Sequence, residues 1–515
     1  MGMPARAEAR AGGVSALRLL AVAFGTGAAV MVVELMAVRL MAPWFGASQL
    51  VWTHVIGVVL AALAAGQWLG GLWAERGRGP GLPALLVVAG ALVVAMPELV
   101  ALLGAGILPD DLQLEEAYPF VTWGSLLVAL VVMGLPLVLL GAVSPFLVRM
   151  TRGVEAAPGL TTGRVMAAGT LGALVGTFAA GYVLLAWLGS AGAVRLAGGV
   201  LVLCAGLVRT GRAPRAALLA WLVPLGLVVT DGPDAARGAT VLEARETPYQ
   251  TVRVDELEGG VRLLRVNEAL DSYHSAWRPD GVLTGYYFDA FVLPALLAAP
   301  DESGVVRTLV IGLAGGTMAR QILTFAPGQQ VEGVEIDPDV VALGRRWFDL
   351  PAEVRVHAGV DGRTVVAHGT RRWGAILVDA YAHQIYLPAH LCTREFFAQL
   401  RARVLAGGVV ALNLGGRSRQ DPVVAAVAGT CATAFEHVEM AWVPASRNMI
   451  VLAWAGAPAS LARRREILAE ADLLGALGWL AEPNRFAPVA PAPEPLRDGD
   501  APVEALAHQA WRSHS

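Results

Sequence analysis

The chain has 515 residues, a net charge of −3 and 56% hydrophobic residues, and only 16% of its residues are charged. A soluble globular chain carries about 25% charged residues, so this composition excludes an ordinary water-exposed protein. The slightly negative charge argues against nucleic acid as a partner. The three cysteines, Cys204, Cys392 and Cys431, have neither metal-ligand spacing nor the spacing of a disulfide framework, and we expect no metal.

Residues 1–235 predict a transmembrane helical domain, because a helix needs roughly 20 apolar residues to cross a bilayer. About seven stretches meet this requirement: 16–41, 50–74, 82–107, 121–148, 163–188, 191–208 and 214–231. The first is too long for a signal-peptide core and is interpreted as a retained anchor. The expected partner is therefore the lipid bilayer, and the expected location is the cell membrane.

Arginines cluster before the first stretch and after the second, fourth and sixth, while an acidic loop at 109–118 falls on the opposite side. The positive-inside rule then places the N-terminus in the cytoplasm. Seven crossings would place the C-terminal half outside the cell.

Glu34, Arg39 and Glu98 are ionisable residues that lie in the apolar stretches. Such groups are costly at membrane depth, so they pair or face a cavity. Glu34 and Arg39 are interpreted either as a substrate or headgroup site or, as we favour, as a pair near the interface. Small residues at Gly172, Gly176 and Gly181 predict close helix packing.

Residues 240–300 form the lead-in to a second domain. Alternating apolar and polar positions in 240–275, around a turn at 258–260, predict a β-hairpin, and 286–298 predicts a helix. Residues 461–515 predict a helix at 461–475 and then an Ala/Pro-rich extended linker at 487–495.

Between these segments, residues 301–460 alternate short buried strands with helices. Strands are predicted at 307–312, 331–336, 354–356, 374–378 and 408–412, with helices from 339 and at 393–405. This alternation predicts a doubly wound, α/β Rossmann-like sheet, which binds ligands at the carboxyl ends of its strands.

Each of the first four strands ends in a residue suited to a nucleotide ligand. The loop 312–317 is rich in glycine, which lets the backbone approach a ligand at a helix N-terminus. Glu335 ends the second strand and suits a ribose diol. Asp361 with Gly362 follows the third strand and Asp379 the fourth, a combination that NAD-binding domains do not usually share.

Residues 241–455 resemble a bacterial spermidine synthase, or polyamine aminopropyltransferase, of the subgroup fused to a membrane domain. The resemblance is carried by ETPYQTVRV (246–254), RLLRVNEALDSYHSAWRP (262–279), TLVIGLAGGTMAR (308–320), VEGVEIDPDVV (331–341), HAGVDGR (357–363) and AILVDAYAHQIYLPAHLCTREFF (375–397). The segments 32–46 and 495–506 also match.

The resemblance implies a class I S-adenosylmethionine-binding fold and S-adenosylmethionine or its decarboxylated form as co-substrate. Gln250 would contact it, Glu335 would hold the ribose hydroxyls and Asp361 the adenine amine. Asp379 and Tyr381 are the implied catalytic residues. The implied cofactor-binding residues are Gln250, Gly312, Gly315, Gly316, Glu335, Asp337, Asp361 and Gly362.

The sequence departs from the family pattern at three positions. Gly315 stands where the family carries an Asp for the aminopropyl amine, Ala382 where it carries a second acid, and Val443 where it carries a Tyr. Each change removes a polar side chain that could bind a polyamine or the aminopropyl group. The changes therefore disfavour putrescine, and the expected substrate is another small-molecule amine or an unknown acceptor. The residues expected to bind it are Tyr273, His274, Tyr287, His383 and Gln384.

Asp379 has a direct chemical rationale. An alkylamine titrates near 10 and must lose a proton to attack carbon, and a nearby carboxylate can orient it and accept that proton. The alternatives are methyl transfer or sulfonium cleavage on the same fold, or a non-catalytic nucleotide-binding transporter or sensor. Since S-adenosylmethionine is cytoplasmic, we expect a cytoplasmic catalytic domain, against the arginine count. The family also implies a homodimer.

Overall fold

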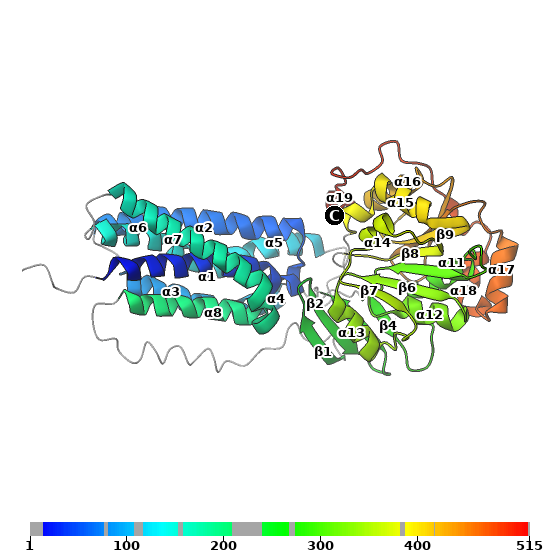
Figure 1. Cartoon of the computed structure of the whole chain (residues 1–515), viewed down its shortest axis with the longest axis horizontal. Helices are drawn as coiled ribbons and strands as arrows, with labels where there is room; N and C mark the ends of the chain where they lie inside the picture. The colour runs from blue at the N-terminus through cyan, green and yellow to red at the C-terminus, as the bar shows by residue number, and fades with distance from the viewer. Residues whose placement is uncertain are drawn as a thin grey trace, which may run out of the picture. The chain divides into compact units, whose positions relative to one another are not determined.

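A computed structural model describes residues 14–76, 81–107, 117–152, 158–208, 239–266, 273–381, 387–416 and 418–512. The chain divides into two compact units, Met1–Asp234 and Ala235–Ser515 (Figure 1).

Unit 1 is a bundle of helices. Its described elements are α1 Ala16–Phe45, α2 Gln49–Arg76, α3 Leu82–Val94, α4 Met96–Ile107, α5 Ala117–Val128, the π-helix η1 Ala129–Met133, α6 Gly134–Arg152, α7 Pro158–Ala179, the π-helix η2 Ala180–Leu184 and α8 Leu185–Leu207. Four described stretches are long and apolar enough to cross a membrane, or five if the α3–α4 pair, bent by 50°, is one span.

One of those stretches, Gly159–Leu207, contains two helices separated by a kink. Gly189 breaks the helix with a φ of 65°. A Cβ on Gly172 would touch Phe24 of α1, and one on Gly25 would touch Cys204. Gly172 of α7 and Cys204 of α8 therefore contact neighbouring residues of α1, Phe24 and Gly25. The chain runs away from this point along α7 and returns to it along α8. The two predicted helices at 163–188 and 191–208 are thus separate, and α8 runs back toward the end of the bundle where α1 begins.

Each predicted apolar stretch up to residue 208 coincides with a described helix or bent helix, whereas the seventh, 214–231, lies outside the described residues. Close packing is confirmed at Gly172 and Gly176, where a Cβ would lie 1.9 and 2.4 Å from the backbone of α1. It is wrong for Gly181, which faces open space.

Glu98 of α4 forms an ion pair with Arg195 of α8. Arg195 is a partner that the sequence analysis did not assign. The pairing agrees with the cost of an isolated charge in an apolar bundle.

Unit 2 begins with a small antiparallel sheet in the order β1-β2-β3-β4. Its strands are β1 Thr240–Glu246, β2 Thr251–Glu256, β3 Arg262–Val266 and β4 Ser275–Trp277. The predicted turn joins β2 to β3, and positive φ angles of 86° at Gly259 and 78° at Gly260 explain its two glycines. The sheet is larger than the single hairpin that the alternation predicted, since β1 and β4 add to its two sides.

The larger sheet has eight strands in the order β12-β10-β11-β9-β8-β5-β6-β7. They are β5 Arg307–Ile311, β6 Gln330–Glu335, β7 Arg355–Ala358, β8 Trp373–Val378, β9 Val404–Gly415, β10 His437–Trp442, β11 Asn448–Trp454 and β12 Ala487–Pro488. Strands β5 to β9 are parallel, whereas β11, β10 and β12 pair antiparallel. The sheet is therefore mixed, and the antiparallel end is a correction to the predicted parallel sheet.

Helices cover both faces of this sheet. They are η3 Tyr287–Phe291, α11 Val292–Leu296, α12 Thr317–Phe325, α13 Pro338–Trp347, α14 Gly362–His368, η4 Ala389–Leu391, α15 Arg394–Arg403, α16 Pro422–Cys431, α17 Leu461–Glu470, α18 Leu474–Leu477, η5 Gly478–Ala481 and α19 Val503–Arg512. The predicted helix 286–298 is instead a 3-10 turn, η3, continued by the short α11.

The Ala/Pro-rich segment 487–495 is extended, as predicted, but it is not a free linker. Its residues Ala487 and Pro488 form the edge strand β12, which pairs with β10, and the Val489 N–H donates to the Val438 carbonyl at 2.9 Å. An edge strand offers unpaired backbone groups, and proline is tolerated there because it need not donate inward.

Strand β5 lies between β6 and β8, and the chain winds in opposite directions from it. Ligands of doubly wound sheets bind at such a switch point, outside the carboxyl ends of the strands. The carboxyl ends of β5 and β8 are followed by Gly312 and Asp379, so the topology alone brings these two residues together.

Candidate active site

The loop after β5 and the tip of β8 are in backbone contact. Gly312 has a φ of 83°, and a Cβ added there would lie 2.2 Å from the Asp379 carbonyl oxygen. The Asp379 N–H also donates to the Ile311 carbonyl at 2.9 Å. Glycine at 312 is therefore required both by conformation and by space, and it sets the position of Asp379.

Two neutral donors hold the Asp379 carboxylate. Tyr287 Oη donates to Asp379 Oδ2 at 3.0 Å, and Asn413 Nδ2 donates to Asp379 Oδ1 at 2.7 Å. Asn448 Nδ2 donates in turn to Asn413 Oδ1 at 2.9 Å, which fixes the orientation of the Asn413 amide. Among the described residues, both side chains that donate to Asp379 are neutral, so a positively charged substrate can approach a carboxylate that is oriented but not neutralised.

Burial raises the pKa of Asp379 to about 6, while the hydrogen bonds from Asn413 and Tyr287 oppose that rise. Burial and the neighbouring Asp379 charge raise the pKa of Tyr287 well above its usual value, so its hydroxyl stays a donor. A carboxylate with a pKa near 6 is a better proton acceptor than an ordinary aspartate and is still ionised at neutral pH.

Tyr287→Phe is expected to move the acidic limb of the pH–rate profile upward by roughly one pH unit. The Tyr287 hydrogen bond stabilises the charged form of Asp379, so its removal raises the pKa further; a hydrogen bond to a charged group contributes about 1.5–3 kcal/mol, and 1.36 kcal/mol is one unit. The measurement is kcat/KM from pH 5 to 9. Tyr182→Phe, at an exposed tyrosine of unit 1, is the control. An unshifted limb would show that Asp379 does not govern it.

The Tyr381 hydroxyl forms two hydrogen bonds with the backbone of the neighbouring strand, β9. It donates to the Asn413 carbonyl at 3.1 Å and accepts the Gly415 N–H at 2.8 Å. Burial raises its pKa. Tyr381 thereby holds the end of β9, and with it the Asn413 side chain that contacts Asp379.

Glu335 and Asp337 form a second group, at the tip of β6. Glu335 Oε2 accepts the Ala314 N–H at 2.9 Å, and its Oε1 accepts the Asp337 N–H at 3.1 Å. Burial raises the pKa of Glu335 to about 7. The contact with Ala314 ties the glycine loop to the residue expected to hold a ribose.

Asp337 is fully buried and links this group to the small sheet. It caps α13 by accepting the Asp339 N–H at 3.0 Å, and it accepts from Thr247 Oγ1 at 2.6 Å and Gln250 Nε2 at 3.5 Å. Burial raises the pKa of Asp337. The structure therefore brings the predicted residues Gln250, Glu335 and Asp337 to one edge of the sheet.

Gly315 is buried beneath the loop. Its N–H donates to Ser275 Oγ at 2.8 Å, and a Cβ there would lie 2.9 Å from that oxygen and 3.1 Å from the Phe348 ring. Ala314, in contrast, is partly exposed, with a φ of 48°. A side chain on this loop reaches the site from position 314 rather than 315, and neither residue carries a charge. Gly316 caps α12 in the left-handed region, with a φ of 91°.

Asp361 lies at the tip of β7 and caps α14, accepting the Arg363 N–H at 2.9 Å. Its second oxygen is 2.8 Å from His390 Nε2. A Cβ on Gly362 would lie 2.3 Å from the Ile311 side chain, so glycine allows α14 to start against β5.

Aromatic rings extend from Asp379 toward the small sheet. Tyr287 packs on Phe288 with ring centroids 4.1 Å apart, Phe288 on Tyr273 at 6.0 Å, and Tyr273 on Tyr286 at 4.4 Å. The predicted acceptor residues Tyr273 and Tyr287 therefore belong to one ring cluster. His274 is fixed by its backbone N–H, which donates to the Leu264 carbonyl at 2.7 Å. His383 and Gln384, together with Ala382, lie outside the described residues.

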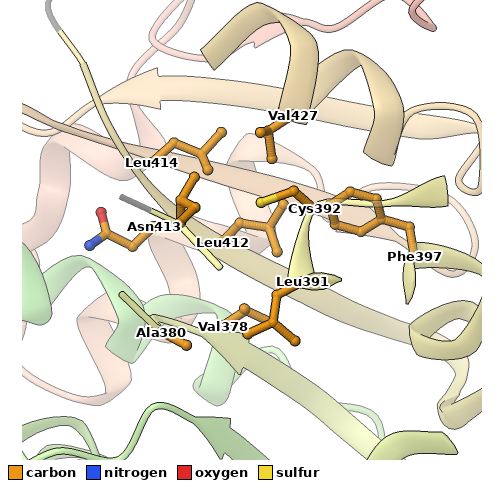
Figure 2. Close-up of a pocket in the computed structure, with 10 residues that line it drawn as sticks. Val378, Ala380, Leu391, Cys392, Phe397, Leu412, Asn413, Leu414 and Val427 are labelled. Carbon is orange, nitrogen blue, oxygen red and sulfur yellow. The ribbon is translucent and has the colours of Figure 1, made fainter. Parts of the chain in front are cut away.

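A small apolar pocket lies behind Asn413, between β8, β9 and α15 (Figure 2). Its volume, about 10 Å³, holds at most one water molecule. The Asn413 amide points away from Cys392 and Phe397, which line the pocket (Figure 2). The pocket is too small for a nucleoside, and the Asn413 amide, which points away from it, donates to the Asp379 carboxylate.

Several residues of the site were missed by sequence reasoning: Thr247, Ser275, His390, Asn413 and Asn448. Asn413 follows the predicted strand 408–412 as Asp379 follows the predicted strand 374–378, so the same strand-end rule could have found it. The others contact the site only through tertiary pairing. In the described part of the chain, no group of three or more His, Cys, Asp or Glu side chains could hold a metal ion.

Comparisons with known proteins find polyamine aminopropyltransferases among the curated relatives of this chain. A probable polyamine aminopropyl transferase of Bifidobacterium longum is 31% identical over 37% of this chain and 41% of its own length. A polyamine aminopropyltransferase of Mycobacterium tuberculosis is 27% identical over 77% of each chain. The chain spans about two fifths of the first two curated relatives it matches.

Among solved structures, a probable spermidine synthase from Corynebacterium glutamicum is 21% identical, covers 53% of this chain and 94% of its own, and gives a TM-score of 0.39. No protein-family model matches the chain. These relatives, named polyamine aminopropyltransferases, support a spermidine synthase-like family for this chain.

Proposed function

We propose that this chain is a membrane-anchored transferase of the aminopropyltransferase class, which moves an aminopropyl group from decarboxylated S-adenosylmethionine to an amine other than putrescine. The observation that carries the proposal is the Asp379 carboxylate, oriented by Tyr287 and Asn413 and seated against the glycine loop at the switch point of the sheet.

The residues suit a nucleoside co-substrate. The loop after β5 leads through Gly312 and Gly316, both with positive φ angles, into the N-terminus of α12, where backbone N–H groups can face a ligand. The Glu335 carboxylate is held by two backbone N–H groups beside that loop, and its remaining acceptor positions can take the two hydroxyls of a ribose. Gln250 lies at the same edge, where its Nε2 donates to the Asp337 carboxylate.

The reaction needs a base more than an acid. The amine nitrogen attacks the methylene carbon bonded to the sulfonium; the new C–N bond forms as the C–S bond breaks, and its electron pair passes to sulfur to give methylthioadenosine. The neutral sulfur leaves without protonation. The proton of the amine passes to the Asp379 carboxylate and then to water.

The pKa of Asp379 fits this role. An alkylammonium near 10 exceeds a carboxylate near 6 by about four units, or ~5 kcal/mol, so Asp379 orients the amine and accepts its proton as the nitrogen becomes cationic. An unperturbed aspartate would face a larger gap. The partly exposed Tyr273 and Tyr286 rings can cover the alkylammonium chain through cation–π contacts.

A second candidate is chemistry on intact S-adenosylmethionine: methyl transfer or sulfonium cleavage. It is favoured by one observation, the absence of an acid at Ala314 and Gly315, because the aminopropyl amine then lacks an anionic partner in this loop.

The test is a product analysis of the detergent-purified chain, supplied separately with S-adenosylmethionine and its decarboxylated form and with a panel of amines. Methylthioadenosine from the decarboxylated form, only when an amine is present, is the expected result. S-adenosylhomocysteine would indicate methyl transfer, and methylthioadenosine from intact S-adenosylmethionine would indicate cleavage or aminocarboxypropyl transfer. Binding without any product would favour a sensor.

We also propose that unit 1 crosses the cell membrane and that unit 2 faces the cytoplasm. Support comes from the apolar helices and from α8, which runs back toward the end of the bundle where α1 begins. Unit 2 would face the outside only if residues 214–231 crossed the membrane once more. A C-terminal fluorescent protein that matures only in the cytoplasm should fluoresce, whereas a C-terminal alkaline phosphatase should be inactive. The reverse pattern would place unit 2 outside. A homodimer remains an expectation from the family.

A further inference from the structure

We propose that His390 is a positioning residue that sets the base selectivity of the nucleotide site, by orienting the Asp361 carboxylate toward the exocyclic amine of an adenine. The inference rests on the proposed function, since it assumes that the site takes an adenine nucleoside.

Asp361 is held from two sides. Its Oδ1 accepts the Arg363 N–H at 2.9 Å, and its Oδ2 lies 2.8 Å from His390 Nε2. The helix cap alone would leave the second oxygen free to turn. A carboxylate has about four acceptor positions, so two bonds fix its plane and still leave capacity for a ligand.

His390 is itself held in place. Arg363 donates to the His390 carbonyl at 3.0 Å and binds both carboxylate oxygens of Asp498 at 2.6 Å. Thr393 Oγ1 also donates to Asp498, at 2.8 Å. Three segments thus meet at one guanidinium that is 17% exposed: the β7–α14 junction, η4 and the C-terminal tail. A bidentate network of this kind is more rigid than an isolated surface pair.

The pair lies where a nucleoside base would be expected. The Gly359 N–H donates to the Glu335 carbonyl at 2.9 Å, so the segment leading to Asp361 runs beside the expected ribose-binding residue. The side chains of His390 and Asp361 are 47% and 33% exposed, which leaves them accessible to a small molecule.

A carboxylate discriminates between bases by hydrogen-bond polarity. It accepts from a 6-amino group but faces a 6-oxo group as one acceptor against another, and an unpaired polar group in a binding site is costly. That discrimination requires a fixed carboxylate. With His390 removed, Asp361 can turn toward solvent and the two bases should bind more equally.

The experiment measures dissociation constants of 5′-methylthioadenosine and 5′-methylthioinosine by calorimetry on the full-length chain in detergent. We expect the wild type to prefer the adenine nucleoside by roughly tenfold or more. In His390→Ala this ratio should fall to about threefold or less, whereas His390→Gln, which keeps an N–H donor, should restore it. Asp361→Asn should favour the inosine nucleoside, because its amide can donate to the 6-oxo group.

His368→Ala, at an exposed histidine at the other end of α14, is the matched control and should keep the wild-type ratio. A wild-type ratio in His390→Ala would overturn the proposal, as would an equal loss of affinity for both nucleosides, which marks a purely structural role. A wild type that binds neither nucleoside overturns the proposed function as well. A wild type that binds both equally overturns the selectivity proposal and leaves the transferase intact.

Discussion

Asp379→Asn is expected to lower kcat by about 10²–10⁴-fold while leaving the affinity for methylthioadenosine within a few-fold of the wild type. This range is the contribution that a positioned general base makes. The amide has the same shape: its oxygen can accept from Asn413, and its NH₂ can donate to the Tyr287 hydroxyl, so the fold is preserved. The amide cannot take up the proton that the attacking amine releases.

The measurement pairs single-turnover product formation with equilibrium binding of methylthioadenosine. Asp472→Asn is the control, because Asp472 is exposed and its φ of 56° is one that asparagine also adopts. A variant with wild-type turnover would remove Asp379 from the mechanism. Equal losses of turnover and binding would instead show that Asp379 shapes the nucleoside site.

Gly312→Ala is expected to destabilise unit 2 by about 2–4 kcal/mol and to abolish turnover in the protein that remains folded. Two costs combine. The φ of 83° penalises any side chain by ~1 kcal/mol, and the new Cβ would lie 2.2 Å from the Asp379 carbonyl oxygen, an overlap that the backbone must relieve by moving. The residue displaced is the proposed catalytic aspartate.

Gly328→Ala separates these two costs. Gly328 has a φ of 94°, but a Cβ there meets nothing within 4 Å, so only the conformational penalty applies. The thermal unfolding of both variants is monitored through the loss of methylthioadenosine binding. The midpoint temperature should drop by roughly 5–15 °C for Gly312→Ala and by a few degrees for Gly328→Ala. Equal drops would mean that the contact between Gly312 and Asp379 is not made.

Strand ends were the most informative feature of the sequence. Buried runs bounded by glycine or an acid located β5, β6, β7 and β8. The residues at or just after the ends of these strands, Gly312, Glu335, Asp361 and Asp379, lie at one edge of the sheet as predicted. The periodicity of apolar residues was less informative for the strands at the antiparallel end of the large sheet. It did not predict β10 and β11, and it interpreted the edge strand β12 as part of a linker.

The sequence by itself determined the chemical types of this site and their strand assignments, because each acid ends its own strand or follows it within three residues. It also determined the apolar stretches of unit 1, whose length and composition are local properties. Only the tertiary structure decided which neutral side chains hold Asp379. Tyr287 precedes that residue by 92 positions, and Asn413 and Asn448 come from strands that are neighbours only once the sheet has formed.

The same holds for the partners of Asp361 and Glu98. His390 and Arg195 reach them across 29 and 97 residues of sequence, through a loop and a helix packing that no local pattern encodes. The pKa of Asp379 depends on burial and on those distant donors, so it too is a tertiary property. Local spacing can name an acid at a strand end, but its charge state and orientation are set by groups that only folding brings within hydrogen-bonding distance.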